Sequence, residues 1–273
     1  MNYANFIADK LGTIARAGID APLHASVQIG DCLLILGDCR EVFPKLPMVD
    51  AVIVDPPYSK RCHAGHDSAG GYDGPRSDLG YAHLTEDDVK SLADEYALIC
   101  KGWIVWMTDS DLTLAVRRAL ESVGRYAFAP LPFYQPGRSV RLSGDGPCSW
   151  TDYIIVARTA AQHKWGTLPG GYVAGQGWND KARMGGKPTH LMRALVSDYS
   201  RPGDLVLDSH MGAGTTGVAC ALEGRRFIGI EIDREAFDVA CERIENACRQ
   251  APLFPVADTK KPTKSGDLFA EVA

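Results

Sequence analysis

Four consecutive residues near the start of the chain combine groups that could bind a planar base. They are Asp55, Pro56, Pro57 and Tyr58, and they follow the apolar run at residues 51–54. Two prolines in a row forbid helix and fix an extended backbone. A carboxylate and a proline carbonyl side by side would provide two acceptors for an exocyclic amino group, and the tyrosine ring would provide a stacking surface. We therefore predict a catalytic segment, against the alternative of a purely structural turn.

A second group of residues has the pattern of a nucleoside-binding turn. An apolar run at 204–208 ends in an acid, passes through two glycines and enters a predicted helix at 214–222. About twenty residues further on, the next predicted strand ends in Glu231 and Asp233, and a carboxylate at that offset can accept hydrogen bonds from ribose hydroxyls. On its own, this pattern also fits a Rossmann dehydrogenase or a structural turn. The candidate cofactor contacts in the turn are Asp208, His210, Met211, Gly212, Gly214 and Thr215.

Strand and helix patterns alternate along most of the chain. This alternation predicts an α/β fold with a doubly wound, mainly parallel sheet and helices on both faces. The expected strands are 32–37, 51–55, 103–107, 126–134, 152–157, 204–208 and 226–232. The expected helices begin at Thr85 and Pro188 and cover 112–123, 214–222 and 234–249.

The same patterns suggest how the chain is organised. We expect two halves of one α/β domain, separated by an insert that lacks periodicity. The expected segments are a helical extension at 1–24, a catalytic half at 25–158, a short insert at 159–186, a cofactor-binding half at 187–249 and a disordered tail at 250–273. The tail is predicted to be disordered because it is rich in proline and lysine.

Composition limits the class of protein. With 273 residues, 45% hydrophobic and 23% charged, the chain resembles a soluble globular protein. It contains no apolar run long enough to span a membrane and no secretion signal, so we expect a cytoplasmic protein. Its eight cysteines form no C-x-x-C pair and are interpreted as free thiols. Cys62, His63 and His66 could ligate a metal, but a cluster in a glycine-rich loop seldom does, and we expect no metal.

Charge is unevenly distributed. The net charge is −5, yet residues 125–193 carry nine Lys/Arg against three Asp. A basic middle can mark a phosphate-binding face, and scattered surface charge explains it equally well. The candidate phosphate or base contacts are Arg138, Arg141, Lys164, Lys181 and Arg183.

Together these segments resemble the β-class of DNA amino-methyltransferases, in which the catalytic motif precedes the cofactor motif. Residues 55–58 match the family's catalytic tetrapeptide, residues 208–215 its cofactor loop, and Glu231 its ribose-binding acid. Asp38 resembles the acid that contacts the cofactor's adenine. Lys187, in Gly-Lys-Pro, resembles the segment beside the cofactor's methionine end.

The resemblance covers roughly residues 30–248, and the order of all five elements agrees with the family. The chain particularly resembles compact, phage-type members without an obvious nuclease partner. It implies a Rossmann-like methyltransferase fold in which 159–186 is a short target-recognition insert. The implied cofactor is S-adenosyl-L-methionine, with Asp55 lining its site as well as acting in catalysis. The implied reaction is methyl transfer to the N6 of a flipped-out adenine in double-stranded DNA.

Several alternatives stay open. Cytosine N4 is the nearest, because the same geometry serves both amino groups, although the family tends to carry Ser in place of Asp55 for cytosine. RNA or protein amide methylation would favour Asn at that position. A non-catalytic DNA-binding module could also retain the fold. The family's loop usually has Pro and Phe where this chain has Ser209 and His210, which we interpret as a tolerated replacement.

Two further partners are suggested more weakly. The short insert leaves room for target recognition to be shared with residues 59–84 or with a second subunit in a homodimer. The segment from Gln250 to Phe254 resembles the peptide by which bacterial proteins dock on the replication sliding clamp, although a disordered tail explains it as well.

Overall fold

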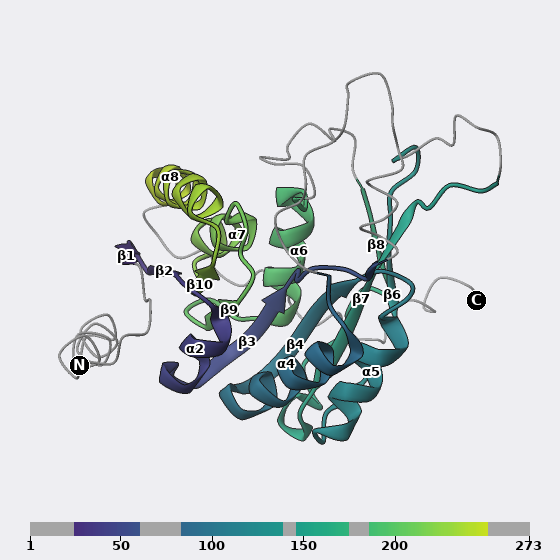
Figure 1. The fold of residues 1–273 in the computed structure, drawn as a ribbon. Helices are drawn as coiled ribbons and strands as arrows, with labels where there is room; N and C mark the ends of the chain where they lie inside the picture. The colour runs from purple at the N-terminus through teal and green to yellow at the C-terminus, as the bar shows by residue number, and fades with distance from the viewer. Residues whose placement is uncertain (1–24, 61–82, 139–145, 175–185, 251–273) are drawn as a thin grey trace, which may run out of the picture.

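The computed structural model describes residues 25–60, 83–138, 146–174 and 186–250. Within this part of the chain, ten strands form one sheet (Figure 1). The strands are β1 (Ala25–Ile29), β2 (Cys32–Leu36), β3 (Val49–Val54), β4 (Cys100–Thr108), β5 (Tyr126–Ala127), β6 (Leu131–Tyr134), β7 (Thr151–Arg158), β8 (Tyr172–Val173), β9 (Leu205–Asp208) and β10 (Arg226–Glu231).

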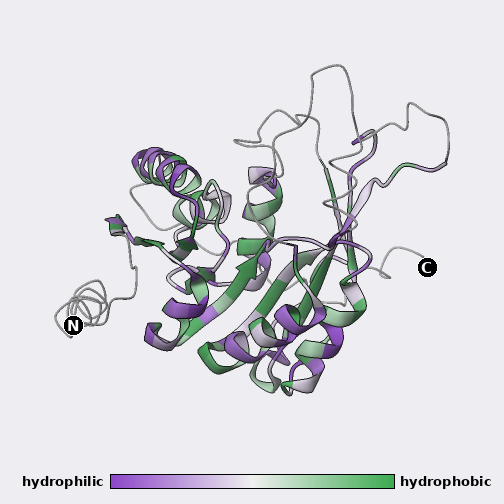
Figure 2. Ribbon diagram, viewed as in Figure 1, coloured by the Kyte–Doolittle hydropathy of each residue, from purple (hydrophilic) through white to green (hydrophobic). Residues whose placement is uncertain are grey.

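The strand order is β1-β2-β10-β9-β3-β4-β7-β6-β8, with β5 beside β7. The five central strands, from β2 to β4 in this order, are parallel. Antiparallel strands extend both edges, since β1 pairs with β2 and β7 pairs with β4. The central strands are almost continuously apolar, as expected for strands that are covered on both faces (Figure 2).

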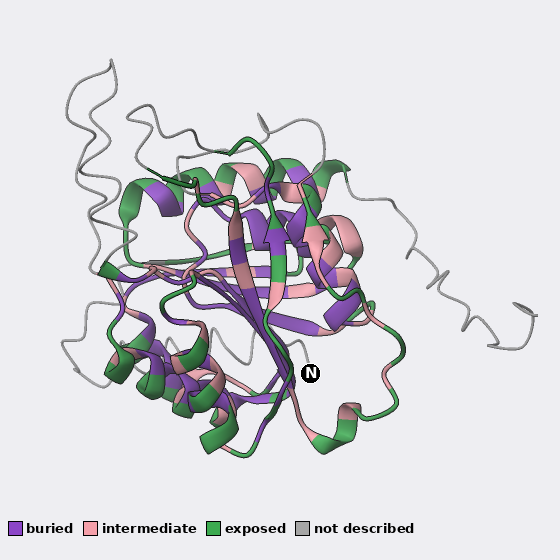
Figure 3. Ribbon diagram, turned by 90° about the vertical axis from the view of Figure 1, so that its right-hand side faces the viewer, coloured by how far each residue is buried: buried purple, intermediate pink, exposed green. Residues whose placement is uncertain are grey.

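Helices cover both faces of the sheet, which confirms the predicted fold class. One face carries α2 (Cys39–Val42), the 3-10 turn η1 (Phe43–Lys45), α4 (Glu86–Ile99) and α5 (Thr113–Ser122). The other carries α6 (Thr189–Tyr199), α7 (Thr215–Glu223) and α8 (Arg234–Gln250). Seen from the side, the buried strands run between these two layers (Figure 3).

Local sequence explains where the helices begin and end. Thr85 and Asp88 form a capping box at α4, in which the Thr85 hydroxyl accepts from the Asp88 amide and the Asp88 carboxylate accepts from the Thr85 amide. Helix α7 lies between Gly214 and Gly224, with φ of 76° and 70°. Left-handed backbone of this kind favours glycine.

The structure corrects three details of the prediction. Strand β1 was missed; it forms a hairpin with β2 around Gly30, whose φ is 55°. The single strand expected at 126–134 is two short strands, β5 and β6, because the pairing with β7 shifts by one residue between Ala127 and Leu131. The insert at 159–186 is not wholly irregular, since β8 pairs with β6.

Several expectations lie outside the described residues. They are the helix in 1–24, most of the 59–84 loop with its Cys62, His63 and His66, and the tail beyond Gln250. Among the helices that the structure describes, none has the length and apolar character needed to cross a membrane.

Candidate active site

The two motifs lie at the ends of neighbouring strands. Strand β3 pairs in parallel with β9 so that Val52 is opposite Leu207. Asp55 directly follows β3, and Asp208 is the last residue of β9. The chain continues from β3 to β4 on one side and from β9 to β10 on the other, so this is the topological switch point of the sheet, where α/β proteins bind ligands.

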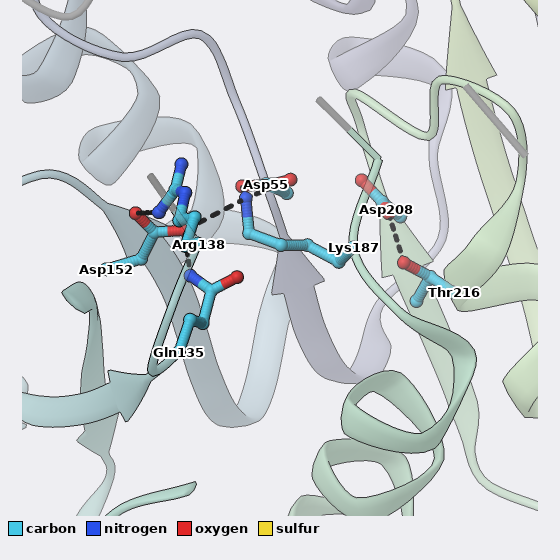
Figure 4. A network of polar contacts seen from close by, with 7 residues as sticks. All are labelled: Asp55, Gln135, Arg138, Asp152, Lys187, Asp208 and Thr216. Carbon is cyan, nitrogen blue, oxygen red and sulfur yellow. Dashed lines mark hydrogen bonds and ion pairs between the residues drawn. The ribbon is translucent and has the colours of Figure 1, made fainter. Parts of the chain in front are cut away.

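Asp55 is bound by a lysine from the other half of the domain. The Lys187 ammonium donates to both carboxylate oxygens of Asp55 at 2.9 Å (Figure 4). The same nitrogen lies 4.7 Å from the centre of the Tyr58 ring. The Lys187 side chain is 9% exposed. This pairing was not predicted, because the sequence resemblance associated Lys187 with the cofactor's methionine end.

A second carboxylate faces the same lysine. Asp152 Oδ2 lies 3.8 Å from the Lys187 ammonium and accepts a hydrogen bond from Gln135 Nε2 at 3.1 Å. Arg138 donates to the other oxygen of Asp152 (Figure 4). Burial opposes ionisation of Asp152, but Lys187 and Arg138 outweigh it and lower its pKa. Burial likewise lowers the pKa of Lys187, and the carboxylates of Asp55 and Asp152 more than compensate and raise it.

The tetrapeptide at residues 55–58 is tethered to the next loop. Asp109, after β4, accepts from the Ser59 amide at 2.9 Å and from the Ser59 hydroxyl at 2.5 Å. Its other oxygen accepts from the amides of Asp111 and Leu112, which precede α5. The Tyr58 carbonyl accepts from the Leu84 amide at 3.1 Å. One carboxylate therefore connects the end of the tetrapeptide to the start of a helix.

Asp208 stabilises the cofactor turn from inside. It is 2% exposed, and its oxygens accept from the His210 amide at 3.0 Å and from the Thr216 hydroxyl at 2.5 Å (Figure 4). Burial raises the pKa of Asp208 to about 7, although these hydrogen bonds act in the opposite direction. Its contacts hold the turn and the start of α7 together.

The two residues that depart from the family pattern form a buried polar cluster. The Ser209 hydroxyl lies 2.6 Å from the Tyr96 hydroxyl and 3.0 Å from His210 Nδ1. His210 Nε2 lies 3.9 Å from the Cys39 sulfur. Burial lowers the pKa of His210 to about 4, so the ring is neutral at physiological pH. The imidazole is thus held by hydrogen bonds where an aromatic ring would rely on packing.

Glu231 and Asp38 lie together at the ends of two other adjacent strands. The carboxylate of Glu231 accepts from the amides of Gly212 and Asp233, both at 2.8 Å. Each of its oxygens retains a lone pair for a ligand hydroxyl. Asp38 follows β2, and the preceding Gly37 amide donates to the Glu231 carbonyl at 2.8 Å. Asp38 also caps α2 by accepting from the Arg40 amide at 2.9 Å.

The glycines of the turn have different roles. A Cβ on Gly212, where φ is 50°, would meet no heavy atom of the described residues within 4 Å, so a ligand can approach this backbone. A Cβ on Gly214 would lie 2.8 Å from that of Ala240, so this glycine permits packing against α8. Open backbone beside a carboxylate that retains free lone pairs fits the ribose of a nucleoside cofactor.

The remaining predicted cofactor residues have structural partners. The amide of the buried Met211 donates to the Ile230 carbonyl at 3.0 Å. Thr215 begins α7, and its hydroxyl accepts from Arg243 at 3.1 Å. Asp233 caps α8 by accepting from the Ala236 amide at 2.7 Å. All three therefore lie at the predicted turn or at the start of the helix after β10.

The basic residues do not form one surface. Arg138 lies beside the site, whereas Lys164 follows β7 at the opposite end of the central strands, where Thr159 bonds to the Lys101 carbonyl. Arg125 is buried, and its guanidinium donates to the carbonyls of Gly102 and Cys100. The basic middle of the sequence is therefore partly structural. The other three candidates, Arg141, Lys181 and Arg183, lie outside the described residues.

Sequence reasoning missed Asp109, Gln135 and the role of Asp152. A signal for Asp152 was present: it alternates with Ile154 and Val156 in β7, and this period places it on an inward face. An acid on the buried face of a strand requires a partner. Nothing in the local sequence distinguishes Asp109 from other turn acids.

The comparisons with known proteins match most directly the segment that contains Lys187 and the turn after β9. A family model described as DNA methylase (N6_N4_Mtase) matches residues 162–242, which include Lys187 and the cofactor turn but not Asp55. Curated relatives are 41–43% identical over stretches of 58–82 residues, so the chain matches only 19–27% of their lengths. One is the DNA adenine methyltransferase YhdJ of Escherichia coli (strain K12), 41% identical over 82 residues, which are 30% of this chain and 27% of YhdJ.

Solved structures match over most of the chain. The M1.HpyAVI–SAM complex aligns with a TM-score of 0.60 and 22% identity, covering 78% of this chain and 98% of that one. The cytosine-N4-specific PvuII DNA methyltransferase aligns with a TM-score of 0.58 and 15% identity, covering 82% and 93%. At these identities the likeness establishes the fold, and the fold is that of the Rossmann-like methyltransferases.

Proposed function

We propose that this chain transfers a methyl group from S-adenosyl-L-methionine to the N6 of adenine in double-stranded DNA. One observation carries the proposal: residues 55–58 directly follow β3, and β3 pairs with β9, the strand that leads into the glycine-containing turn. A donor held at the turn and a base held at the tetrapeptide would therefore meet between two adjacent strand ends. The match of residues 162–242 to the DNA methylase family supports the same activity.

The cofactor would be held by the ends of three neighbouring strands. The free lone pairs of Glu231 suit the ribose hydroxyls, and Asp38 at the next strand end suits the adenine. The open backbone at Gly212 permits close approach. When bound, S-adenosyl-L-methionine supplies an electrophilic methyl group on a sulfonium.

Asp55 and the Pro56 carbonyl would activate the amino group of the base. The lone pair of an adenine amino nitrogen is delocalised into the ring, so the nitrogen is a poor nucleophile. Hydrogen bonds from its two hydrogens to these two acceptors favour a more tetrahedral nitrogen with an available lone pair. As the nitrogen gains the methyl group, it loses one hydrogen as a proton to Asp55 or to water beyond it.

The base must leave the duplex to reach these groups, because its amino nitrogen is inaccessible in a stacked helix. Tyr58 would stack on the flipped base, a contact worth about 1–3 kcal/mol. Arg138 lies beside Asp152 at the same end of the strands and is a candidate phosphate or base contact. Arg141, Lys181 and Arg183 belong to the same proposed interface, whereas Lys164 is too far from Asp55 to join it.

Adenine is proposed over cytosine for two reasons. Position 55 carries Asp, and the relative YhdJ, which matches 82 residues of this chain, is named as a DNA adenine methyltransferase. The alternative is cytosine N4, because the same geometry serves both amino groups. Association as a homodimer, and docking of the segment that starts at Gln250 on a sliding clamp, are further proposals from the sequence. Clamp binding would be tested by pull-down with and without residues 250–273.

Replacing the proposed acceptor tests the activity. Asp55→Ala should lower labelled-methyl transfer to unmodified plasmid DNA by at least about 100-fold, because the base loses an electrostatic acceptor. Cofactor affinity, measured by calorimetry, should change little. Asp87→Ala, at an exposed position of α4, is the matched control. Transfer at the parental rate by Asp55→Ala would refute the mechanism.

A further inference from the structure

The acceptor proposed for the base is covered by a lysine in this structure. The Lys187 ammonium bonds to both oxygens of Asp55 and lies over the Tyr58 ring. It therefore takes one lone pair on each oxygen of the carboxylate that would receive the amino group, and it covers one face of the ring that would stack on the base. A base that stacks on this face of Tyr58 can bring its amino group to Asp55 only if this ammonium moves.

A buried ammonium can move only to another partner, because an unpaired charge is costly in a low-dielectric interior. Among the residues that the structure describes, Asp152 offers such a partner. Its Oδ2 lies 3.8 Å from the ammonium, and charge-assisted hydrogen bonds span about 2.7–2.9 Å, so a shift of about 1 Å completes the contact. Gln135 and Arg138 hold Asp152 in place for it.

We propose, on the basis of the function proposed above, that Lys187 is a displaceable cap on Asp55 and that Asp152 is a positioning residue that takes the ammonium when the base enters. The cap also selects the entering group. When the Lys187 ammonium leaves Asp55, the amino group of the base supplies a new N–H donor to the carboxylate. A carbonyl oxygen in the same position would face the carboxylate without a hydrogen, so thymine would leave the cap in place.

A double-mutant cycle tests the cap. Asp152→Asn, Lys187→Met and the double variant are compared with the parent for methyl transfer to unmodified plasmid DNA, for the KM of DNA and for cofactor affinity. Asp152→Asn should raise the KM of DNA about tenfold, because the ammonium then competes with the base for Asp55 without a second partner. Lys187→Met should lower that KM about threefold, because nothing has to be displaced.

The diagnostic result is the coupling. In the Lys187→Met background, Asp152→Asn should change the KM of DNA by less than about twofold. Lys187→Gln repeats the cycle with a variant that keeps a hydrogen-bond donor, in case the methionine variant does not fold. Asp198→Asn, a buried acid of α6, is the control and should leave all three quantities unchanged.

Three results would overturn the inference. Additive effects would mean that Asp152 acts through Arg138 or through the fold. A tenfold loss of cofactor affinity in Lys187→Met would assign the lysine to the cofactor. Loss of transfer in that variant, with the DNA and the cofactor still bound, would assign the lysine to the methyl-transfer step itself. Failure of the parent protein to methylate DNA is a separate result, because it removes the proposed function and the cap with it.

Discussion

Asp208 is a carboxylate with little access to water, and its ionisation should govern part of the protein's pH dependence. Burial raises its pKa from an ordinary 3.8 to about 7. Between pH 3.8 and about pH 7, the Asp208 carboxyl is more protonated in the folded protein than in the unfolded chain. This contribution to stability is therefore complete below about pH 4 and is lost as the pH rises towards 7.

Asp208→Asn should remove this dependence, because the amide cannot ionise and can still bond to Thr216 and to the His210 amide. The stability of the variant relative to the parent should increase by roughly 2–3 kcal/mol between pH 5 and pH 7. Thermal unfolding of both proteins at several pH values measures it. A difference that is constant with pH would contradict the assigned pKa.

At the level of single residues, the structure places Asp55 and the turn after Asp208 at strand ends, as the sequence led us to expect, but few of their partners were predicted. Residues 55–58 and the turn after Asp208 were identified from residue type and spacing. The contact between Asp55 and Lys187 joins residues 132 apart, so no local pattern encodes it. Lys187 was associated with the cofactor, and only the packing of α6 beside β3 brings its ammonium to Asp55.

The loop that contains Asp109 holds the segment after β3 and the start of α5 together. Asp109 connects Ser59, after the catalytic tetrapeptide, to the residues that begin α5. Asp109→Ala should lower methyl transfer by about 10- to 100-fold, because small misplacements of reacting groups are costly. Cofactor affinity should be retained, and Ser110→Ala is the neighbouring control. Equal rates in the parent and Asp109→Ala would show that the tetrapeptide holds its position without this tether.

Two glycines near the predicted cofactor turn have different roles: one permits packing between helices, and the other leaves space for a ligand. A Cβ on Gly217 would lie 2.4 Å from Ile244 Cδ1, whereas one on Gly212 has open space beside it. Gly217→Ala should cost about 1–3 kcal/mol of stability and leave cofactor affinity intact. Gly212→Ala should cost about 1–2 kcal/mol through backbone strain and weaken cofactor binding at least tenfold. Calorimetry and thermal unfolding measure both, and identical profiles for the two variants would contradict this division.

Helices and central strands were predicted well because their apolar periodicity is strong. The prediction was wrong for short strands that exist only because a neighbouring strand pairs with them. Strand β1 is short and half-polar, and it is a strand because β2 offers it an edge; the Gly30-Asp31 turn was the available signal. Strand β8 has two residues within the insert and exists because β6 pairs with it.

At the scale of the molecule, the strand order brings the two halves of the site together. β9 is inserted beside β3, so a carboxylate from the first half of the chain lies next to a turn from the second half. The register of β3 with β9 establishes this adjacency. Total charge was less informative, because Arg125 and Lys164 lie far from Asp55.

Identification of the base that receives the methyl group tests the proposed activity most directly. Unmodified DNA would be treated with the purified chain and labelled S-adenosyl-L-methionine, digested to nucleosides and analysed by mass spectrometry. We predict label in N6-methyldeoxyadenosine, which should be lost in Asp55→Ala. Label in N4-methyldeoxycytidine would contradict the choice of base, and DNA without label would contradict the proposal that the two motifs form one methyl-transfer site.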